Sequence, residues 1–382
     1  MGFSLPHLIH RGRLAVICGL AIAAALALTA SAWSQLRQSP APAAGSGAAS
    51  PVSVATLMAQ VPYSRLASAE AARIWGELAS APPPATIRGD LLALRRMQSQ
   101  GTDQGLAEMR KRYAVSITSE TLGGVRTDVV MPTEGVTPGN QRRVLVSLHG
   151  GAFIWGAGSE ALLQAIPIAA TSRIKVISVD YRMAPEFRFP SASQDVAAVY
   201  QALLKTHDAK AIGIYGCSAG GVLTAESVAW FSTHDLPQPG AIATLCGTGA
   251  EIEGDSAYLA WLLLGVSVIP PAERQTLSGL PYFRGTDAHD PLAFPIESPA
   301  LLAKFPPTLL LAGSRDFATS SETLMQRRLW ESGVDAELIL FDGLWHAFMM
   351  HPDLPESREV YAILGTFFDR HLARAPSSPA SE

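Results

Sequence analysis

The strongest chemical signal in the sequence is a serine flanked by very small residues. Residues 216–220 read GCSAG, follow a strand-like run and open a helix-like one. A serine on a sharp turn from a strand into a helix projects into the cleft at the end of that strand, and tiny neighbours prevent clashes there. The N-terminus of the helix also favours developing negative charge. The pattern therefore predicts that Ser218 is a nucleophile.

A serine hydroxyl is unreactive at neutral pH and needs a histidine base that a carboxylate holds in place. Where the nucleophile lies on such a strand-to-helix turn, the chain order is serine, acid, histidine. His346 follows the last expected strand and Asp316 follows the strand before it, so we predict these residues as base and acid. The alternative acids are Glu322, on the next expected helix, and Asp342, which is close in sequence to the histidine.

A glycine-rich loop predicts where the negative charge of the reaction would be stabilised. Residues 149–153 read HGGAF and come directly after an apolar strand. Acyl transfer builds an oxyanion that needs preorganised N–H donors, and consecutive glycines can turn these donors inward without a Cβ penalty. We predict that the N–H groups of Gly150, Gly151 and Ala219 form the oxyanion hole. His149 is expected to orient the loop by hydrogen bonding.

The elements that must position these groups alternate between short β-rich runs and helical stretches. Most of the later runs are continuously apolar, as in a parallel sheet with helices on both faces. The alternation from residue 143 onward predicts a doubly wound α/β sheet. The expected strands are Val115–Ile117, Arg126–Met131, Val144–Leu148, Val176–Val179, Ile212–Tyr215, Ala241–Leu245, Thr308–Ala312 and Glu337–Phe341.

Composition allows one large catalytic domain with an appendage. The chain has 382 residues, of which 48% are hydrophobic and 16% charged, so it can bury a substantial core. Its net charge of −4 and the lack of a basic patch give no reason to expect a nucleic-acid partner. Three cysteines fit no disulfide framework and no metal-ligand spacing, so neither a metal nor a cofactor is predicted. Cys217 and Cys246 both follow core strands, where a bridge is conceivable, but we predict two buried free thiols.

The N-terminal region has the pattern of a targeting segment. Arg11 and Arg13 precede an uncharged apolar run and a small-residue motif at 30–32, so residues 1–35 predict an export signal. An uncleaved membrane anchor is the alternative, because the run approaches the length of a bilayer span. Both interpretations place the folded body outside the cytoplasm, as a periplasmic, secreted or membrane-associated protein. Residues 36–53, rich in Ala, Pro, Gly and Ser, are expected to be a flexible linker.

Four motifs in this order resemble those of the bacterial hormone-sensitive-lipase-like esterases of the α/β-hydrolase superfamily. HGGAF is similar to that family's HGGGF, and GCSAGG at 216–221 is similar to its GDSAGG. YRMAPE at 181–186 resembles YRLAPE, and we interpret it as a buried ion-pair corner that supports the active-site loops. The surroundings of the predicted acid and base also fit. Cys217 replaces the usual acidic residue and Ala152 replaces the third glycine.

The resemblance covers about residues 115–372 and implies an α/β-hydrolase fold. That fold has a mostly parallel eight-stranded sheet with a helical cap, which would be built here from about 54–113 and 250–295 of the hydrolase domain 54–382. The side chains that would then line the acyl pocket, or else pack in the core, are Phe153, Trp261, Leu262 and Leu263.

These observations predict a metal-free hydrolase that cleaves small or short- to medium-chain carboxylic esters through an acyl-enzyme. A lactonase is the first alternative, because an internal ester needs the same machinery. An amidase would differ in protonation of the leaving group. A ligand-binding protein on an inactive hydrolase fold is the alternative outside enzymes, and the presence of serine, acid and histidine in the right order argues against it.

Overall fold

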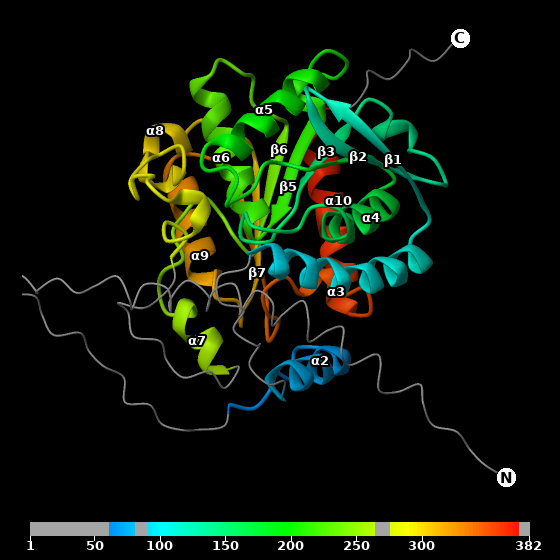
Figure 1. The fold of residues 1–382 in the computed structure, drawn as a ribbon, viewed down its shortest axis with the longest axis vertical. Coiled ribbons are helices and arrows are strands. Elements are labelled where there is room, and N and C mark those ends of the chain that lie inside the picture. The colour runs from blue at the N-terminus through cyan, green and yellow to red at the C-terminus, as the bar shows by residue number, and fades with distance from the viewer. Residues whose placement is uncertain (1–60, 81–90, 264–275, 374–382) are drawn as a thin grey trace, which may run out of the picture.

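The computed structural model describes residues 61–80, 91–263 and 276–373 (Figure 1). The predicted targeting segment and linker lie outside the described residues. Within the described part of the chain, no helix combines the length and the apolar character needed to cross a membrane.

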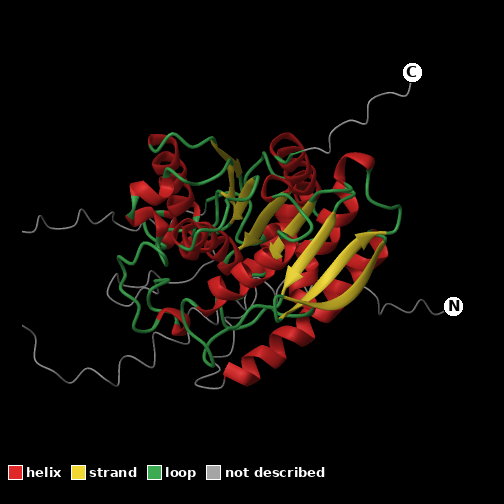
Figure 2. Cartoon of the chain, turned by 90° about the horizontal axis from the view of Figure 1, so that it is seen from above, coloured by secondary structure: helices red, strands yellow, loops and turns green. Residues whose placement is uncertain are grey.

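A single twisted sheet of eight strands forms the centre of the molecule (Figures 1 and 2). The strands are ordered β1-β2-β4-β3-β5-β6-β7-β8; β2 is antiparallel to both of its neighbours, and the remaining pairs are parallel. The predicted α/β-hydrolase fold is therefore confirmed. The strands are β1 Val115–Leu122, β2 Val125–Pro132, β3 Val144–Leu148, β4 Lys175–Val179, β5 Ile212–Cys217, β6 Ala241–Leu245, β7 Thr308–Gly313 and β8 Ala336–Phe341.

The first strand is five residues longer than the sequence predicted. It was expected to end at Ile117 and instead ends at Leu122. Gly123 and Gly124 both have positive φ, of 59° and 84°, which is the backbone that a two-residue hairpin turn requires. The turn pairs the polar end of β1 with β2 through backbone hydrogen bonds, so that this part of the strand needs no apolar side chains.

Helices cover both faces of the sheet. One face packs against α5, α6, α8 and α9, and the other against α4 and α10, with α2 beyond them. In Figure 1, α2, α3 and α7 lie below the lower ends of the central strands. The helices are α2 Ala69–Ser80, α3 Leu91–Arg112, α4 Ser159–Ser172, α5 Ser191–Leu203, α6 Ala219–Thr233, α7 Ser256–Leu263, α8 Pro299–Leu302, α9 Thr319–Glu331 and α10 Pro355–His371. That they cap an active site stays a prediction.

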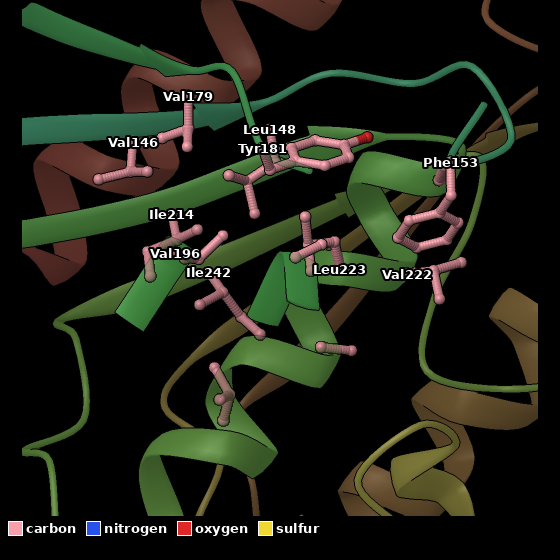
Figure 3. Close-up of a cluster of buried hydrophobic side chains, with 14 of the residues drawn as sticks. Val146, Leu148, Phe153, Val179, Tyr181, Val196, Ile214, Val222, Leu223 and Ile242 are labelled. Atoms are coloured by element: carbon pink, nitrogen blue, oxygen red, sulfur yellow. The ribbon is translucent and has the colours of Figure 1, made fainter. Parts of the chain in front are cut away.

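Side chains of the central strands alternate between the two faces of the sheet and pack against the helices on each face. Val146, Ile214 and Ile242 are almost fully buried on the face of α5 and α6, in one cluster with Val196 of α5 and Leu223 of α6 (Figure 3). Burial of each such side chain stabilises the fold by roughly 1.5–3 kcal/mol. The loops at the ends of these strands thus begin at a rigid, well-packed sheet.

Candidate active site

The sharp turn between β5 and α6 carries Ser218 in a strained conformation. Its φ of 59° lies in the left-handed region, which non-glycine residues rarely adopt. The turn is tightly packed, because a Cβ added to Gly220 would lie 1.9 Å from the carbonyl oxygen of Leu148 and one added to Gly216 would lie 2.4 Å from Gly220. Small residues are therefore a steric requirement of this turn.

Three side chains from separate loops meet at this turn. His346 Nε2 lies 2.9 Å from Ser218 Oγ, and His346 Nδ1 lies 2.9 Å from Asp316 Oδ1. Asp316 is fully buried and also accepts a 2.8 Å hydrogen bond from the backbone N–H of Ala318. The ring of Phe317 stacks on the imidazole with centroids 4.1 Å apart. The structure thus brings the three predicted residues into one hydrogen-bonded chain.

The two alternative acids are occupied elsewhere. Glu322 is buried and accepts a 2.8 Å hydrogen bond from the N–H of Gly247, in the loop after β6. Burial raises its pKa well above the ordinary value, and the nearby Asp316 carboxylate acts in the same direction. Asp342 accepts hydrogen bonds from the hydroxyls of Ser64 and Ser314. The geometry therefore assigns Asp316, and not either alternative, to the imidazole.

The glycine-rich loop after β3 lies against the serine. A Cβ on Gly150 would be 3.3 Å from the Cβ of Ser218, and one on Gly151, whose φ is 96°, would be 2.1 Å from the carbonyl oxygen of Trp155. Ala219 begins α6, and N–H groups in the first turn of a helix have no intrahelical partner. The predicted donors are thus on segments that border the nucleophile.

His149 is held inside the protein beside this loop. Its Nδ1 lies 2.8 Å from the carbonyl oxygen of Gly150, and its ring stacks on Tyr181 with centroids 4.1 Å apart. The Tyr181 hydroxyl donates a 2.6 Å hydrogen bond to the His149 carbonyl. Burial lowers the pKa of His149 to about 4. A neutral imidazole that donates to the loop fits the predicted orienting role.

The buried neutral state of His149 predicts an acid-labile fold. Its pKa is 6.5 when unfolded and about 4 when folded, so the unfolded chain binds the extra proton first as the pH falls. The free energy of unfolding should drop by about 3 kcal/mol between pH 6.5 and pH 4 from this group. Urea unfolding across this window measures the slope. His149→Asn, which removes the titrating ring, should flatten it, whereas an unchanged slope contradicts the assignment. Burial also lowers the pKa of His351 to about 4, so the unfolding free energy of His149→Asn should keep part of its dependence on pH.

The segment 181–186 forms the predicted ion pairs, but they are only partly buried. Arg182 pairs with Asp195 at 2.9 Å, and their side chains are 39% and 10% exposed. Glu186, which is 46% exposed, pairs with Arg95 of α3. The same guanidinium donates to the carbonyl oxygen of Ile154, in the loop after β3, at 2.5 Å. Arg95 thus ties α3 to both active-site segments, a role that no local pattern around it indicated.

A cavity of about 40 Å³ opens beside Ser218. None of the four predicted pocket residues, for which core packing was the alternative, is among the residues that line it, so their role in binding an acyl group stays a prediction. Phe153 is fully buried and stacks on Tyr282, with centroids 4.3 Å apart, so it belongs to the core. Trp261, Leu262 and Leu263 are on α7 and partly exposed. The residues that line the cavity are mainly apolar and include Trp155, Val222, Cys246, Ile252, Leu277 and Phe317.

Cys217 and Cys246 form a disulfide, so the prediction of two free thiols is wrong. Parallel pairing of β5 with β6 places Cys217 opposite Leu245, one residue from its partner. The Cα atoms are 5.6 Å apart, within the roughly 4.4–6.8 Å that disulfides span. Cys246, Asp316 and His346 form a cluster of metal-ligand types. Its sulfur is bonded in the disulfide and its other two groups bond each other, so the cluster offers no free ligand set.

Comparison with known proteins agrees with the observed fold. Residues 145–350, more than half of the chain, match the family described as alpha/beta hydrolase fold. The chain belongs to the α/β-hydrolase family. A solved structure of esterase E25 is 30% identical, with a TM-score of 0.72, and the match covers 84% of this chain and 99% of that one. A solved esterase from the bacterial hormone-sensitive lipase family is 25% identical, with a TM-score of 0.67 and coverage of 80% and 99%. The acetyl-hydrolase of Streptomyces hygroscopicus is 25% identical over 61% of this chain and 78% of its own.

The N-terminal segment of this α/β-hydrolase, residues 61–80, contacts the loops that carry the acid and the base. The guanidinium of Arg315, directly before the acid, lies 4.7 Å from the ring centroids of both Tyr63 and Trp75. The Tyr63 hydroxyl donates a 2.9 Å hydrogen bond to the carbonyl oxygen of Gly343, in the loop that leads to the base. Sequence patterns did not reveal this packing, because the partners are about 240 to 280 residues apart in the chain.

Proposed function

We propose that this α/β-hydrolase cleaves carboxylic esters through a covalent acyl-enzyme on Ser218. The observation that carries the proposal is the hydrogen-bonded chain from Ser218 through His346 to Asp316, with both links at 2.9 Å. Relatives named esterase and acetyl-hydrolase support ester hydrolysis as the reaction. The same hydrogen-bonded chain argues against a purely ligand-binding role, since binding alone needs no activated serine.

The first half of the reaction acylates the serine. Ser218 Oγ attacks the ester carbonyl carbon while His346 Nε2 accepts the hydroxyl proton. The imidazolium that forms is stabilised by the Asp316 carboxylate at its Nδ1–H. His346 then donates the proton to the leaving alcohol, and the C–O bond breaks.

The second half releases the acid. Water attacks the acyl-enzyme while the neutral His346 accepts its proton, and the imidazolium returns that proton to Ser218 Oγ. Both halves pass through a tetrahedral oxyanion, and the N–H groups of Gly150, Gly151 and Ala219 are the proposed donors to it. Donors that are fixed before the reaction need no reorganisation when the charge forms.

The cavity beside the serine favours small acyl groups. It measures about 40 Å³ and is lined by apolar side chains such as Val222, Ile252 and Leu277. We therefore propose short, uncharged acyl chains as preferred substrates. A series of p-nitrophenyl esters from acetate to decanoate, with simple lactones alongside, measures this preference. A maximum in kcat/KM at long chains would contradict it.

Reaction with a fluorophosphonate tests the activated serine directly. The serine oxygen displaces fluoride from phosphorus, so a covalent adduct should form, and peptide mass spectrometry should place it on Ser218. Heat-unfolded protein is the control, because it contains the same serine without the imidazole beside it. Adducts of equal yield in both samples, or none on Ser218, would contradict the proposed function.

We also propose that the protein is exported from the cytoplasm. The N-terminal pattern of two arginines, an apolar run and a small-residue motif supports this. The Cys217–Cys246 disulfide adds support, because disulfides persist in oxidising compartments. Cell fractionation followed by N-terminal sequencing tests it: protein found in the cytosol with its first 35 residues intact would contradict export.

A further inference from the structure

The disulfide between Cys217 and Cys246 joins the ends of two strands directly beside the nucleophile. We propose that it is a positioning element of the active site, which holds Ser218 and the loop after β6 in the arrangement that the reaction needs. This inference rests on the proposed function and goes beyond it, because it gives a covalent bond outside the reacting groups a part in positioning them.

The disulfide connects two points of backbone strain. Ser218, the next residue after Cys217, has a φ of 59°, and Cys246 itself has a φ of 48°. Non-glycine residues keep such conformations only where the surrounding structure over-determines them. A covalent bond that ends at one strained residue and adjoins the other supplies such a constraint.

The bond acts where the sheet no longer constrains the chain. The last paired residues of β5 and β6 are Cys217 and Leu245, and beyond them both chains leave the sheet. One hydrogen bond of 2.8 Å, from the N–H of Ser218 to the carbonyl oxygen of Leu245, continues the contact. Gly247 then packs so closely that an added Cβ would lie 2.5 Å from the carbonyl oxygen of Ser218. The disulfide fixes the spacing of the two segments across this contact.

Movement of Cys246 would also reach the other groups of the site. Its sulfur, an oxygen of Asp316 and a ring nitrogen of His346 all lie within 4.8 Å of one another. Cys246 borders the cavity beside Ser218 as well. Both cysteines are only 1% exposed, so the disulfide lies in the packed interior directly next to the site. Loss of the bond should therefore shift the reacting groups relative to one another.

Reduction of the Cys217–Cys246 disulfide tests its positioning role without replacing any side chain. Dithiothreitol donates two electrons and two protons, the S–S bond breaks into two thiols, and the reagent becomes a cyclic disulfide. We would use the full chain with Cys18→Ser, so that only the bonded pair contributes thiols. Iodoacetamide and mass spectrometry then count the thiols, and circular dichroism reports folding. Rates are taken well below the unfolding midpoint of the reduced form.

The expected result is a fall in kcat of about 10- to 100-fold on reduction, with a smaller change in KM, because misplacement by about 1 Å can cost that much. Reoxidation by oxidised glutathione, which takes the two electrons and two protons back, should restore kcat. Cys217→Ala/Cys246→Ala should show the same loss without any reductant. The matched control is Met349→Leu: Met349 sulfur lies 3.7 Å from the Cys217 sulfur, and this change keeps the bond and most of the volume. It should retain both full activity and sensitivity to reduction.

Two results would overturn the inference. One is a folded, reduced protein with the kcat of the oxidised form. The other is alkylation of Cys217 and Cys246 in protein from an exporting host before any reductant is added. Failure of the proposed function looks different, since the oxidised protein would then turn over no ester and take up no fluorophosphonate.

Discussion

Replacing Ser218 with alanine should lower kcat for p-nitrophenyl acetate by about 10⁵- to 10⁶-fold. The change removes the only atom that can form the acyl-enzyme, and the remaining groups then act merely as an oxyanion site, as in other serine hydrolases. Among the described residues, the Ser218 hydroxyl makes its hydrogen bond to His346 Nε2 alone. Stability should change little, because only one partly buried oxygen is lost and the Cβ stays in place.

Ser227→Ala is the matched control for this experiment. Ser227 lies on α6, the helix that Ser218 starts, and donates a 2.6 Å hydrogen bond to the carbonyl oxygen of Leu223. Its loss should leave kcat within about twofold, since Ser227 is buried inside the fold and does not line the cavity, so the change acts on stability. Comparable activity of Ser218→Ala and Ser227→Ala would refute the assignment of the nucleophile.

Replacing Asp316 with asparagine should lower kcat by about 10⁴-fold. The carboxylate accepts from His346 Nδ1–H, which leaves Nε2 free to accept the serine proton. An amide that donates to Nδ1 instead favours the wrong tautomer, and it does not stabilise the imidazolium. Size and shape are nearly unchanged, so the loss should appear in kcat and not in the unfolding midpoint of the protein.

Asp342→Asn is the control that distinguishes the two candidate acids, Asp316 before β8 and Asp342 after it. Asp342 accepts from Ser314 Oγ at 3.0 Å and has no contact with the imidazole. We expect its kcat to stay within a few-fold of the original chain. A larger loss of kcat in Asp342→Asn than in Asp316→Asn would mean that Asp342, and not Asp316, holds His346 in solution.

The sequence was sufficient to predict a doubly wound α/β sheet because the signals for it are local, whereas the α/β-hydrolase fold was implied by the family resemblance. Continuous apolar runs such as Val144–Leu148 match buried parallel strands, and the glycines around Ser218 match a steric requirement of the turn. The acid and the base could be found because each follows a strand in a fixed order. These predictions needed no knowledge of which strands are neighbours.

Features that depend on spatial neighbours were not predicted. The disulfide follows from the pairing of β5 with β6, which the sequence alone does not determine. The sequence left Phe153 either in the pocket or in the core; the structure stacks it on Tyr282 in the core, with a φ of 58°, and residue type does not report that direction. The hydrogen bonds that Arg95 of α3 makes were likewise invisible, since they join segments far apart in the chain.

The contacts of residues 61–80 have a consequence for the order of events during biosynthesis. A ribosome makes Tyr63 long before Gly343, yet the two are hydrogen-bonded in the finished molecule. Contacts between the ends of a chain form late, because the loop they close is long. An emerging polypeptide of this kind can build its nucleophile turn before residue 343 is made, but it acquires a supported acid and base only afterwards.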